Sequence, residues 1–368
     1  MNRVLISFTA MLVSKWLKAS LALPTLSRRP FSIKALELKV NTFGDPRKVL
    51  NLKETLLEGD LAEDEAIVKF LACPINPADI NTIQGTYGIK PSLPFCPGNE
   101  GVGQVTEIGS NSDNLAVGDW VIPKDSGMGT WRSHMLCRTD KLFKVRNDIP
   151  VVGAATLAVN PCTAYRMLND FVKLQPGDVV IQNGANSAVG QNVIQMASHM
   201  KVKTINIVRD RKDITPLKNY LFDLGATVVL ADVELRLLKS VSGMDKPKLA
   251  LNCVGGKSAL ELMKKLEKGG IMVTYGGMSH HPVTVSTASL IFNDVTLKGY
   301  WMTRWNRLNH DSEERLAMIR SISDMIASGQ LKSSPFDEVP FVKFGDAFDK
   351  VMKASEGFSP NKQLLVFD

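Results

Sequence analysis

The feature that most constrains the fold is a repeated alternation of apolar runs and helical patterns in the second half of the chain. Six short apolar runs follow Pro161, at residues 179–181, 204–208, 228–230, 249–254, 271–275 and 295–300. Helical patterns separate several of them, at 188–200, 214–224, 234–241 and 258–267. Short apolar runs predict strands buried on both faces, and helical crossovers between them predict a parallel sheet. We therefore expect an α/β fold with a six-stranded, doubly wound parallel sheet.

The preceding part of the chain is rich in glycine and proline and predicts short strands instead. These strands are expected at 34–41, 64–73, 101–109, 118–123 and 132–145. Turn signals such as Gly44-Asp45-Pro46 and Gly118-Asp119 separate them, which is typical of a β barrel or sandwich. The chain ends with a helix at 313–328 and a strand-like segment at 363–367, which we expect to return to this first domain.

The first 33 residues are predicted to be a mitochondrial transit peptide. Residues 1–34 hold six basic residues and no acidic one, and an amphipathic, acid-poor start of this kind is typical of such peptides. The alternative is a secretory signal with residues 4–13 as its apolar core. Lys15 and Lys18 follow that core, where a secretory signal carries small residues for cleavage. We expect a protein of the mitochondrial matrix.

Composition excludes several other classes of protein. The net charge of the chain is +7, but six of these charges lie in residues 1–34, so a nucleic-acid-binding surface is not expected. The sequence has no run of about 18 apolar residues, so no membrane span is predicted. The five cysteines are widely spaced and form no CxxC motif, which excludes a disulfide scaffold and a cysteine-rich zinc module.

The strongest local signal for a cofactor is the segment that joins the first apolar run to the next helix. It runs from Gly184 to Gly190 through small residues, so backbone N–H groups could approach a pyrophosphate at the start of the helix. The strict GxGxxG spacing is absent, because Ala185 and Ala188 occupy positions where glycines often stand. The alternative is a turn that serves close packing only.

Two arginines at the end of the second run indicate which dinucleotide is bound. Arg209 and Arg211 flank Asp210 about 20 residues after the turn, where an acid binds the ribose of NAD and an arginine accommodates the 2′-phosphate of NADP. A guanidinium matches a phosphate, so NADPH is favoured. The alternative is a solvated loop with an exposed ion pair.

Several motifs together resemble the medium-chain dehydrogenase/reductase superfamily. They are PGNEGVG at 97–103, VGDWVIP at 117–123 and NCVGG at 252–256. A closer resemblance, to the mitochondrial trans-2-enoyl-thioester reductases, is carried by NPADIN at 76–81, IQGTYG at 83–88, NPCTAYRM at 160–167, RDR at 209–211 and YGGM at 275–278. The resemblance implies a GroES-like catalytic domain of residues 34–160 and 310–368, with a Rossmann NADPH-binding domain at 161–309 inserted into it.

The resemblance also implies a reductase without zinc. Zinc-dependent members of the superfamily hold their catalytic metal with a cysteine and a histidine, and the aligned positions here are Asn76 and Asn99. Asparagine is a poor zinc ligand beside a thiolate or an imidazole. The four-cysteine structural lobe of those members is missing too, so we predict no metal site.

In these relatives, hydride from NADPH adds to the β carbon of an enoyl thioester on acyl carrier protein or coenzyme A, and the α carbon takes a proton. The tyrosine aligned with Tyr87 is the proposed proton donor, and a phenol with a reference pKa of about 10 stays protonated at neutral pH. Water could take its place. The alternative interpretation of Tyr87 is a loop aromatic that lines a cleft.

The same resemblance implies sixteen contacts to NADPH. They are Asn160, Asn186, Ser187, Ala188, Val189, Arg209, Asp210, Arg211, Tyr275, Gly276, Gly277, Met278, Tyr300, Trp301, Met302 and Lys362. For Lys362 an exposed lysine before a strand is an equal alternative. A homodimer through the edge strand of the cofactor sheet is expected. A zinc-free quinone or enal reductase, and an NADPH-binding regulator without activity, are the other functions to be distinguished.

Overall fold

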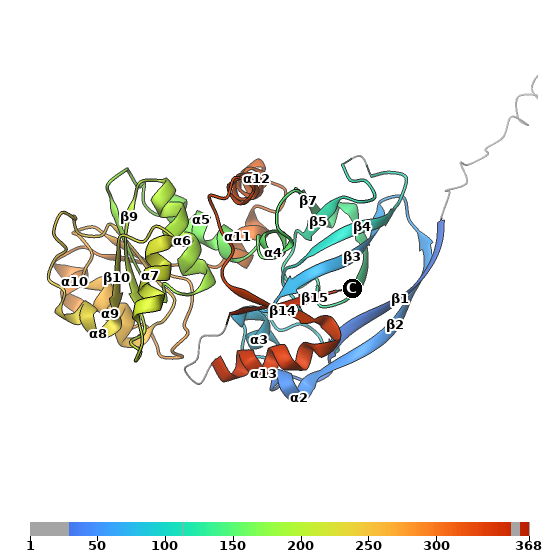
Figure 1. The fold of residues 1–368 in the computed structure, drawn as a ribbon, viewed down its shortest axis with the longest axis horizontal. Helices are drawn as coiled ribbons and strands as arrows, with labels where there is room; N and C mark the ends of the chain where they lie inside the picture. The colour runs from blue at the N-terminus through green and yellow to red at the C-terminus, as the bar shows by residue number, and fades with distance from the viewer. Residues whose placement is uncertain (1–28, 113, 355–360, 368) are drawn as a thin grey trace, which may run out of the picture.

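The computed structural model describes residues 29–112, 114–354 and 361–367. Figure 1 shows two bodies side by side, one built on a sheet with helices on both faces and one composed mostly of strands. The predicted transit peptide lies outside the described residues except for positions 29–33.

The first body contains six parallel strands in the order β10-β9-β8-β11-β12-β13. Their bounds are β8 Val179–Asn183, β9 Lys203–Val208, β10 Val228–Ala231, β11 Leu249–Asn252, β12 Ile271–Thr274 and β13 Thr296–Gly299. The chain moves outward in opposite directions from the β8–β11 pair, which is the switch point of a doubly wound sheet. The predicted fold class and its six strands are confirmed.

Helices cover both faces of this sheet because successive side chains of a strand point to opposite sides. In β8, Val180 packs in one core with Met167, whereas Val179 and Ile181 pack in another with Leu262. The helices of this body are α5 Asn160–Asp170, α6 Ala188–His199, α7 Thr215–Asp223, α8 Asp232–Leu237, α9 Gly256–Met263, α10 Thr287–Ile291 and α11 Met302–Leu308.

The second body contains a sheet in the order β14-β15-β3-β4-β5-β7, with β6 paired to β3. Its strands are β3 Glu65–Pro74, β4 Val102–Ile108, β5 Trp120–Pro123, β6 His134–Arg138, β7 Leu142–Val145, β14 Phe336–Pro340 and β15 Lys362–Val366. The single strand predicted at 132–145 is wrong, because a 3-10 turn at Thr139–Lys141 divides it into β6 and β7. The predicted return of the chain end is confirmed: β15 pairs with β3, with Leu364 opposite Pro74.

A long hairpin of β1, Arg29–Val40, and β2, Leu50–Leu61, lies along the second body. β2 was not predicted, because its side chains are largely exposed and polar and give no apolar alternation. Residues 29–33, which the sequence places in the transit peptide, belong to β1, and Phe31 packs there with Leu61 and Ile67.

Short helices and one long helix complete the second body. They are α2 Pro46–Val49, α3 Pro77–Ile83, α4 Val151–Ala155, α12 Glu313–Ala327, α13 Phe344–Ala354 and the 3-10 turn Phe341–Lys343. The predicted helix at 313–328 is confirmed as α12. The two bodies meet where the start of α5, the start of β15 and the connector from α12 to β14 line one pocket.

Candidate functional site

The predicted cofactor residues gather at one edge of the parallel sheet. The loops at 184–187, 209–211, 253–256, 275–278 and 300–301 follow the carboxyl ends of β8, β9, β11, β12 and β13. Since these strands are parallel, their carboxyl ends share one edge, where sheets of this kind bind ligands. Asn160, at the start of α5, and Lys362, at the start of β15, line the pocket between the two bodies together with Ala188. The structure therefore brings together segments that are far apart in the sequence.

The turn between β8 and α6 is compact because its two end glycines are closely packed. Gly184 has φ +58°, and a Cβ there would lie 2.5 Å from the Cys253 sulfur. A Cβ on Gly190 would lie 2.6 Å from the carbonyl oxygen of Ala185. The Ser187 hydroxyl accepts the Gly190 N–H at 3.1 Å and caps α6. The first turn of α6 is thereby held at the edge of the sheet, where its backbone N–H groups and helix dipole favour an anion.

A pair of buried asparagines fixes the ends of β8 and β11. The Asn183 amide donates to Asn252 Oδ1 at 2.8 Å, and Asn183 Oδ1 accepts the Cys253 N–H at 2.8 Å. Asn252 Oδ1 also accepts the Gly255 N–H at 3.1 Å. These asparagines set the path of two cofactor loops. They were not predicted as site residues, although each is a polar residue at the end of an apolar strand, and this pattern could have indicated them.

The loop after β12 has features that suit a dinucleotide. The Tyr275 hydroxyl oxygen is buried and has no hydrogen-bond partner among the described residues. A Cβ on Gly277 would meet nothing within 4 Å, so there is open space in front of this backbone. Met278 is 56% exposed. The open backbone of this loop leaves room for a bound dinucleotide, whereas the Tyr275 hydroxyl is buried beside Ser187 and Cys253.

The loop after β9 presents two arginines to solvent. The Asp210 carboxylate accepts the backbone N–H of Arg211 at 2.9 Å, and the Asp210 N–H donates to Asp232 Oδ1 at 3.2 Å. Arg209 and Arg211 are exposed, and neither forms an ion pair with any described residue. The aspartate therefore serves the loop backbone, while both guanidinium groups remain available to a phosphate.

Tyr300 and Met302 direct their side chains into the protein. The Tyr300 hydroxyl donates to the Met302 sulfur at 3.0 Å, and its ring lies edge-on to Phe171 with 6.0 Å between centroids. Burial raises the pKa of Tyr300 well above the ordinary value of tyrosine. Met302 is 7% exposed. These side chains support the core, so any contact with the cofactor from this segment is expected from its backbone.

Tyr87 lies in the loop after α3 and meets Trp301 at the start of α11. The Trp301 indole N–H donates to the Tyr87 oxygen at 2.7 Å, and the two rings are edge-on with 5.9 Å between centroids. An indole N–H can only donate, so the tyrosine oxygen is the acceptor and its own proton remains available to another group. A Cβ on Gly88 would lie 4.0 Å from the Trp301 ring, so the loop passes close to the indole.

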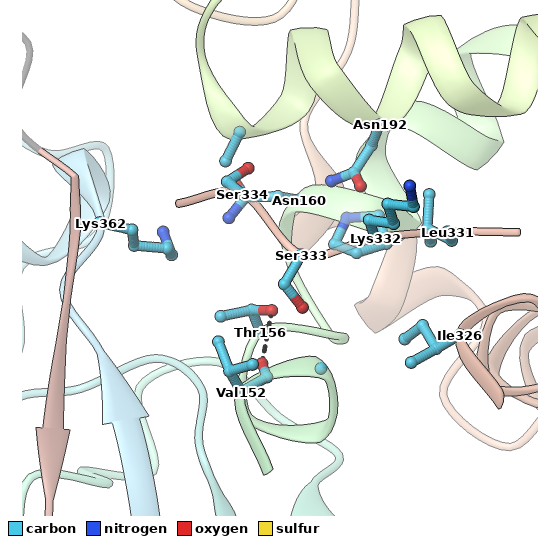
Figure 2. Close-up of a pocket in the computed structure, with 13 residues that line it drawn as sticks. Val152, Thr156, Asn160, Asn192, Ile326, Leu331, Lys332, Ser333, Ser334 and Lys362 are labelled. Atoms are coloured by element: carbon cyan, nitrogen blue, oxygen red, sulfur yellow. Dashed lines mark hydrogen bonds between the residues drawn. The ribbon is translucent and has the colours of Figure 1, made fainter. Parts of the chain in front are cut away.

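A buried polar network lies behind the pocket, at the start of α3. The amide of Asn76 donates to Glu100 Oε1 at 2.7 Å, and its oxygen accepts from Lys362 Nζ at 2.6 Å and from the Asn160 amide at 3.3 Å. Asp79 accepts the Asn76 backbone N–H at 2.8 Å. Figure 2 shows the Lys362 side chain directed from β15 toward Asn160 across the pocket.

Burial shifts the titration of the charged members of this network. It raises the pKa of Glu100 to about 7 and that of Asp79 to about 6, with the nearby Lys362 opposing both shifts. The pKa of Lys362 is lowered by burial, and the two carboxylates oppose that shift. Asn76 and Glu100 were not predicted to belong to the cofactor site, because their partners are remote in the sequence.

The described residues show neither a metal-ligand cluster nor a membrane helix. No group of three or more His, Cys, Asp or Glu side chains in the described ranges is arranged to hold a metal ion. Asn76 and Asn99, which the sequence resemblance relates to zinc-ligand positions, are engaged in hydrogen bonds with Glu100 and Asp79. No helix in the part of the chain that the structure describes is both long and apolar enough to span a bilayer.

Comparison with known proteins places these features in a family. Residues 62–147 match the alcohol dehydrogenase GroES-like domain, and residues 188–320 match the zinc-binding dehydrogenase family. A solved structure of Etr1p with NADP and crotonyl-CoA covers 91% of this chain and 100% of its own, with a TM-score of 0.82 and 35% identity. The same values hold for the heterodimer of Etr1p and Etr2p, described as the mitochondrial 2-enoyl thioester reductase of Candida tropicalis.

Several relatives are similar along most of both chains. The mitochondrial enoyl-[acyl-carrier-protein] reductase of Mus musculus is 49% identical over 328 residues, which cover 88% of this chain and 86% of the relative. The arrangement of a parallel cofactor sheet beside a GroES-like body agrees with that likeness. The chain belongs to the enoyl-[acyl-carrier-protein] reductase family, within the medium-chain dehydrogenase/reductase superfamily.

Proposed function

We propose that this protein is a mitochondrial oxidoreductase that reduces trans-2-enoyl thioesters to saturated acyl thioesters with NADPH. The observation that carries the proposal is the Tyr87–Trp301 pair, which holds a phenol hydroxyl at the edge of the cofactor loops. The name of the Mus musculus relative and the crotonyl-CoA complex of Etr1p support the same substrate class. The quinone or enal reductase that the sequence left open has less support, because these similar proteins are described as acting on enoyl thioesters.

The residues at the sheet edge suit the two anionic groups of NADPH, its pyrophosphate and its 2′-phosphate. We assign the pyrophosphate to the first turn of α6, at Asn186, Ser187, Ala188 and Val189, and the 2′-phosphate to Arg209 and Arg211. The remaining proposed contacts are Asn160, Asp210, Tyr275, Gly276, Gly277, Met278, Tyr300, Trp301, Met302 and Lys362. When bound, NADPH supplies the hydride that adds to the β carbon of the substrate.

Tyr87 is the proposed proton donor to the α carbon. The Trp301 indole occupies a lone pair of the phenol oxygen at 2.7 Å, which orients the hydroxyl and leaves its proton free to be donated. A carbanionic α carbon is a much stronger base than a phenolate, so the transfer is downhill. A water molecule could replace the phenol at lower efficiency.

The test compares two substrate classes with the purified protein. Consumption of NADPH is followed with crotonyl-CoA and, separately, with a small quinone, each in the presence and absence of a chelator. We expect turnover with crotonyl-CoA that the chelator does not reduce, and a preference for NADPH over NADH. Turnover of the quinone alone would favour the alternative, and binding of NADPH without turnover of either substrate would favour a regulatory protein.

The finer assignments complete this proposal. The thioester carrier is acyl carrier protein or coenzyme A, which present the same phosphopantetheine arm. We place the protein in the mitochondrial matrix. Because residues 29–33 of the predicted transit peptide pair with β2, we propose that the peptide removed from the chain ends before β1. Residues 34–160 and 310–368 are proposed as the catalytic domain and residues 161–309 as the NADPH-binding domain. The pairing of β15 with β3 supports this division, because it joins the last segment of the chain to the sheet of residues 34–160.

We also propose that the protein forms a homodimer through β13. This strand ends the parallel sheet, and its four residues are exposed. The adjoining α10 segment exposes Ile291 at 67% and Phe292 at 73%. An exposed edge strand beside apolar side chains is a typical interface, and Etr1p pairs with Etr2p in the heterodimer. Light scattering should give a dimer mass for the native chain and a monomer mass for Phe292→Glu; a dimeric Phe292→Glu would contradict this interface.

A further inference from the structure

The amide of Asn76 connects a buried anion to a buried cation. Its nitrogen donates to Glu100 Oε1 at 2.7 Å, and its oxygen accepts from Lys362 Nζ at 2.6 Å. Within the described residues Glu100 and Lys362 form no direct ion pair, so the amide stands between the two charges. Asn76 is 3% exposed and Glu100 is 1% exposed, and water therefore does not screen the arrangement.

The position of Glu100 is fixed from its other side as well. Its Oε2 accepts the backbone N–H of Val159 at 2.9 Å, directly before the start of α5. Asn160, the first residue of α5, donates its amide to the oxygen of Asn76 at 3.3 Å. A carboxylate with both oxygens occupied is rigid, so the amide that it holds has a defined orientation.

The ammonium group of Lys362 faces the pocket with donors to spare. An ammonium has three N–H donors, and one of them is used by Asn76. Lys362 lines the pocket together with Asn160 (Figure 2). Ala188, at the start of α6, is also among the residues that line it. A cation at this place lies near the helix start that is proposed to hold the pyrophosphate of the dinucleotide.

We infer that Glu100 and Asn76 are positioning residues, which hold Lys362 as a charged group aimed at a phosphate of the dinucleotide. This inference rests on the proposed function of Lys362 as a cofactor contact. Glu100 touches neither cofactor nor substrate and acts on Lys362 through Asn76. We call this chain of hydrogen bonds from Glu100 through Asn76 to Lys362 the relay; no proton moves along it. It gives a role to a buried carboxylate that cannot reach the reacting atoms.

The relay has a consequence for pH. Burial lowers the pKa of Lys362, while the carboxylates of Glu100 and Asp79 raise it; Lys332, at the opposite wall, is the other charged group lining the pocket. Without the charge of Glu100, the pKa of Lys362 falls further, so the amine loses its proton at a lower pH. An uncharged amine binds phosphate poorly, so dinucleotide binding should then weaken as pH rises.

The test measures the Kd for NADPH by calorimetry between about pH 7 and about pH 9.5, using Glu100→Gln and Asn76→Ala. Glu100→Gln should bind NADPH about tenfold more weakly than the native chain at the upper pH and should be less affected at the lower pH. Asn76→Ala keeps the carboxylate but removes the hydrogen bond that orients Lys362, so it should bind NADPH more weakly at both pH values. Glu107→Gln, on β4, is the matched control and should behave as the native chain. Adding Lys362→Arg to Glu100→Gln should remove the pH dependence, because arginine stays charged.

Three results would overturn the relay. They are native affinity in both variants, a loss of equal size at every pH in Glu100→Gln, and a pH dependence of Glu100→Gln that survives the Lys362→Arg change. Since the two variants alter opposite ends of the Asn76–Glu100 bond, misfolding of one, detected by circular dichroism, leaves the other to decide. Turnover of crotonyl-CoA by the native chain is measured separately, so a failure of the proposed substrate class is distinguished from a failure of the relay.

Discussion

Replacing Tyr87 with phenylalanine separates the chemical role of the hydroxyl from the structural role of the ring. In the native chain the phenol oxygen accepts the Trp301 N–H at 2.7 Å, and the rings are edge-on at 82°. Phenylalanine keeps this ring contact and removes only the hydroxyl. The indole N–H loses its partner, but Trp301 is 37% exposed, so water can take the vacant place.

The two effects of Tyr87→Phe differ in size. A neutral hydrogen bond that water can replace contributes about 1 kcal/mol or less to stability, which corresponds to a change in Tm of a few degrees at most. Loss of a general acid lowers kcat by roughly 100- to 10,000-fold, which is about 2.7 to 5.4 kcal/mol of transition-state stabilisation. Because water can act as a poorer donor, we expect the lower end of this range.

The assay is steady-state reduction of crotonyl-CoA by NADPH, with thermal unfolding of the same preparations. Tyr87→Phe should lose about 100-fold in kcat with little change in the KM for NADPH and in Tm. Trp301→Phe is the control for orientation: it keeps the proton donor and should lose much less. If Tyr87→Phe retains nearly native kcat, Tyr87 is not the proton donor. If Tm collapses together with kcat, the reasoning that the hydroxyl contributes little to stability is refuted.

Three further outcomes follow from the geometry. Arg209→Ala with Arg211→Ala should raise the KM for NADPH roughly 10- to 100-fold and leave the KM for NADH unchanged; equal effects on both cofactors would contradict 2′-phosphate binding. Gly190→Ala should destabilise the protein by about 1 to 3 kcal/mol in chemical denaturation, because its Cβ has no room, whereas Gly345→Ala, with nothing within 4 Å, should not. The pKa of Asp79 is raised to about 6, so it binds its proton more tightly in the folded chain, and the stability it contributes is lost as pH rises from about 4 to 6. Chemical denaturation between these pH values should show a smaller loss of unfolding free energy for Asp79→Asn than for the native chain. If the unfolding free energy of the variant falls with pH as steeply as that of the native chain, this reasoning is refuted.

The parallel sheet could be predicted because strands that are buried on both faces consist of continuous apolar runs. β8 and β9 are buried along almost their whole length, and both were located to within two residues at each end. β2 could not be predicted in this way, since most of its residues are exposed and its pairing with β1 alone defines it. Periodicity reports burial, so a strand without a buried face leaves no such pattern.

In the candidate site as well, some features could be predicted from the sequence and others could not. Segments 184–190 and 209–211 carry local signals, a tight turn and a pair of arginines, and the structure brings both to the carboxyl edge of the sheet. The contact between Tyr87 and Trp301 joins residues that are 214 positions apart in the sequence. Nothing in the sequence around either residue indicates that the other is its partner. A resemblance to a family could propose each residue singly, but only the fold could show that the indole donates to the phenol.

The role of Asn76 depends on its hydrogen-bond partners in the fold, which its residue type alone does not reveal. Read from the sequence, an asparagine aligned with a zinc ligand signified only a poor metal ligand. In the folded chain the same amide must donate to Glu100 and accept from Lys362, whose position lies 286 residues later. A thiolate could only accept there and would repel the carboxylate, and alanine would leave a buried charge without its partner. An amide meets both demands without adding charge. The Asn76 amide is thus what allows a buried carboxylate and an ammonium to share one side chain beside the cofactor pocket.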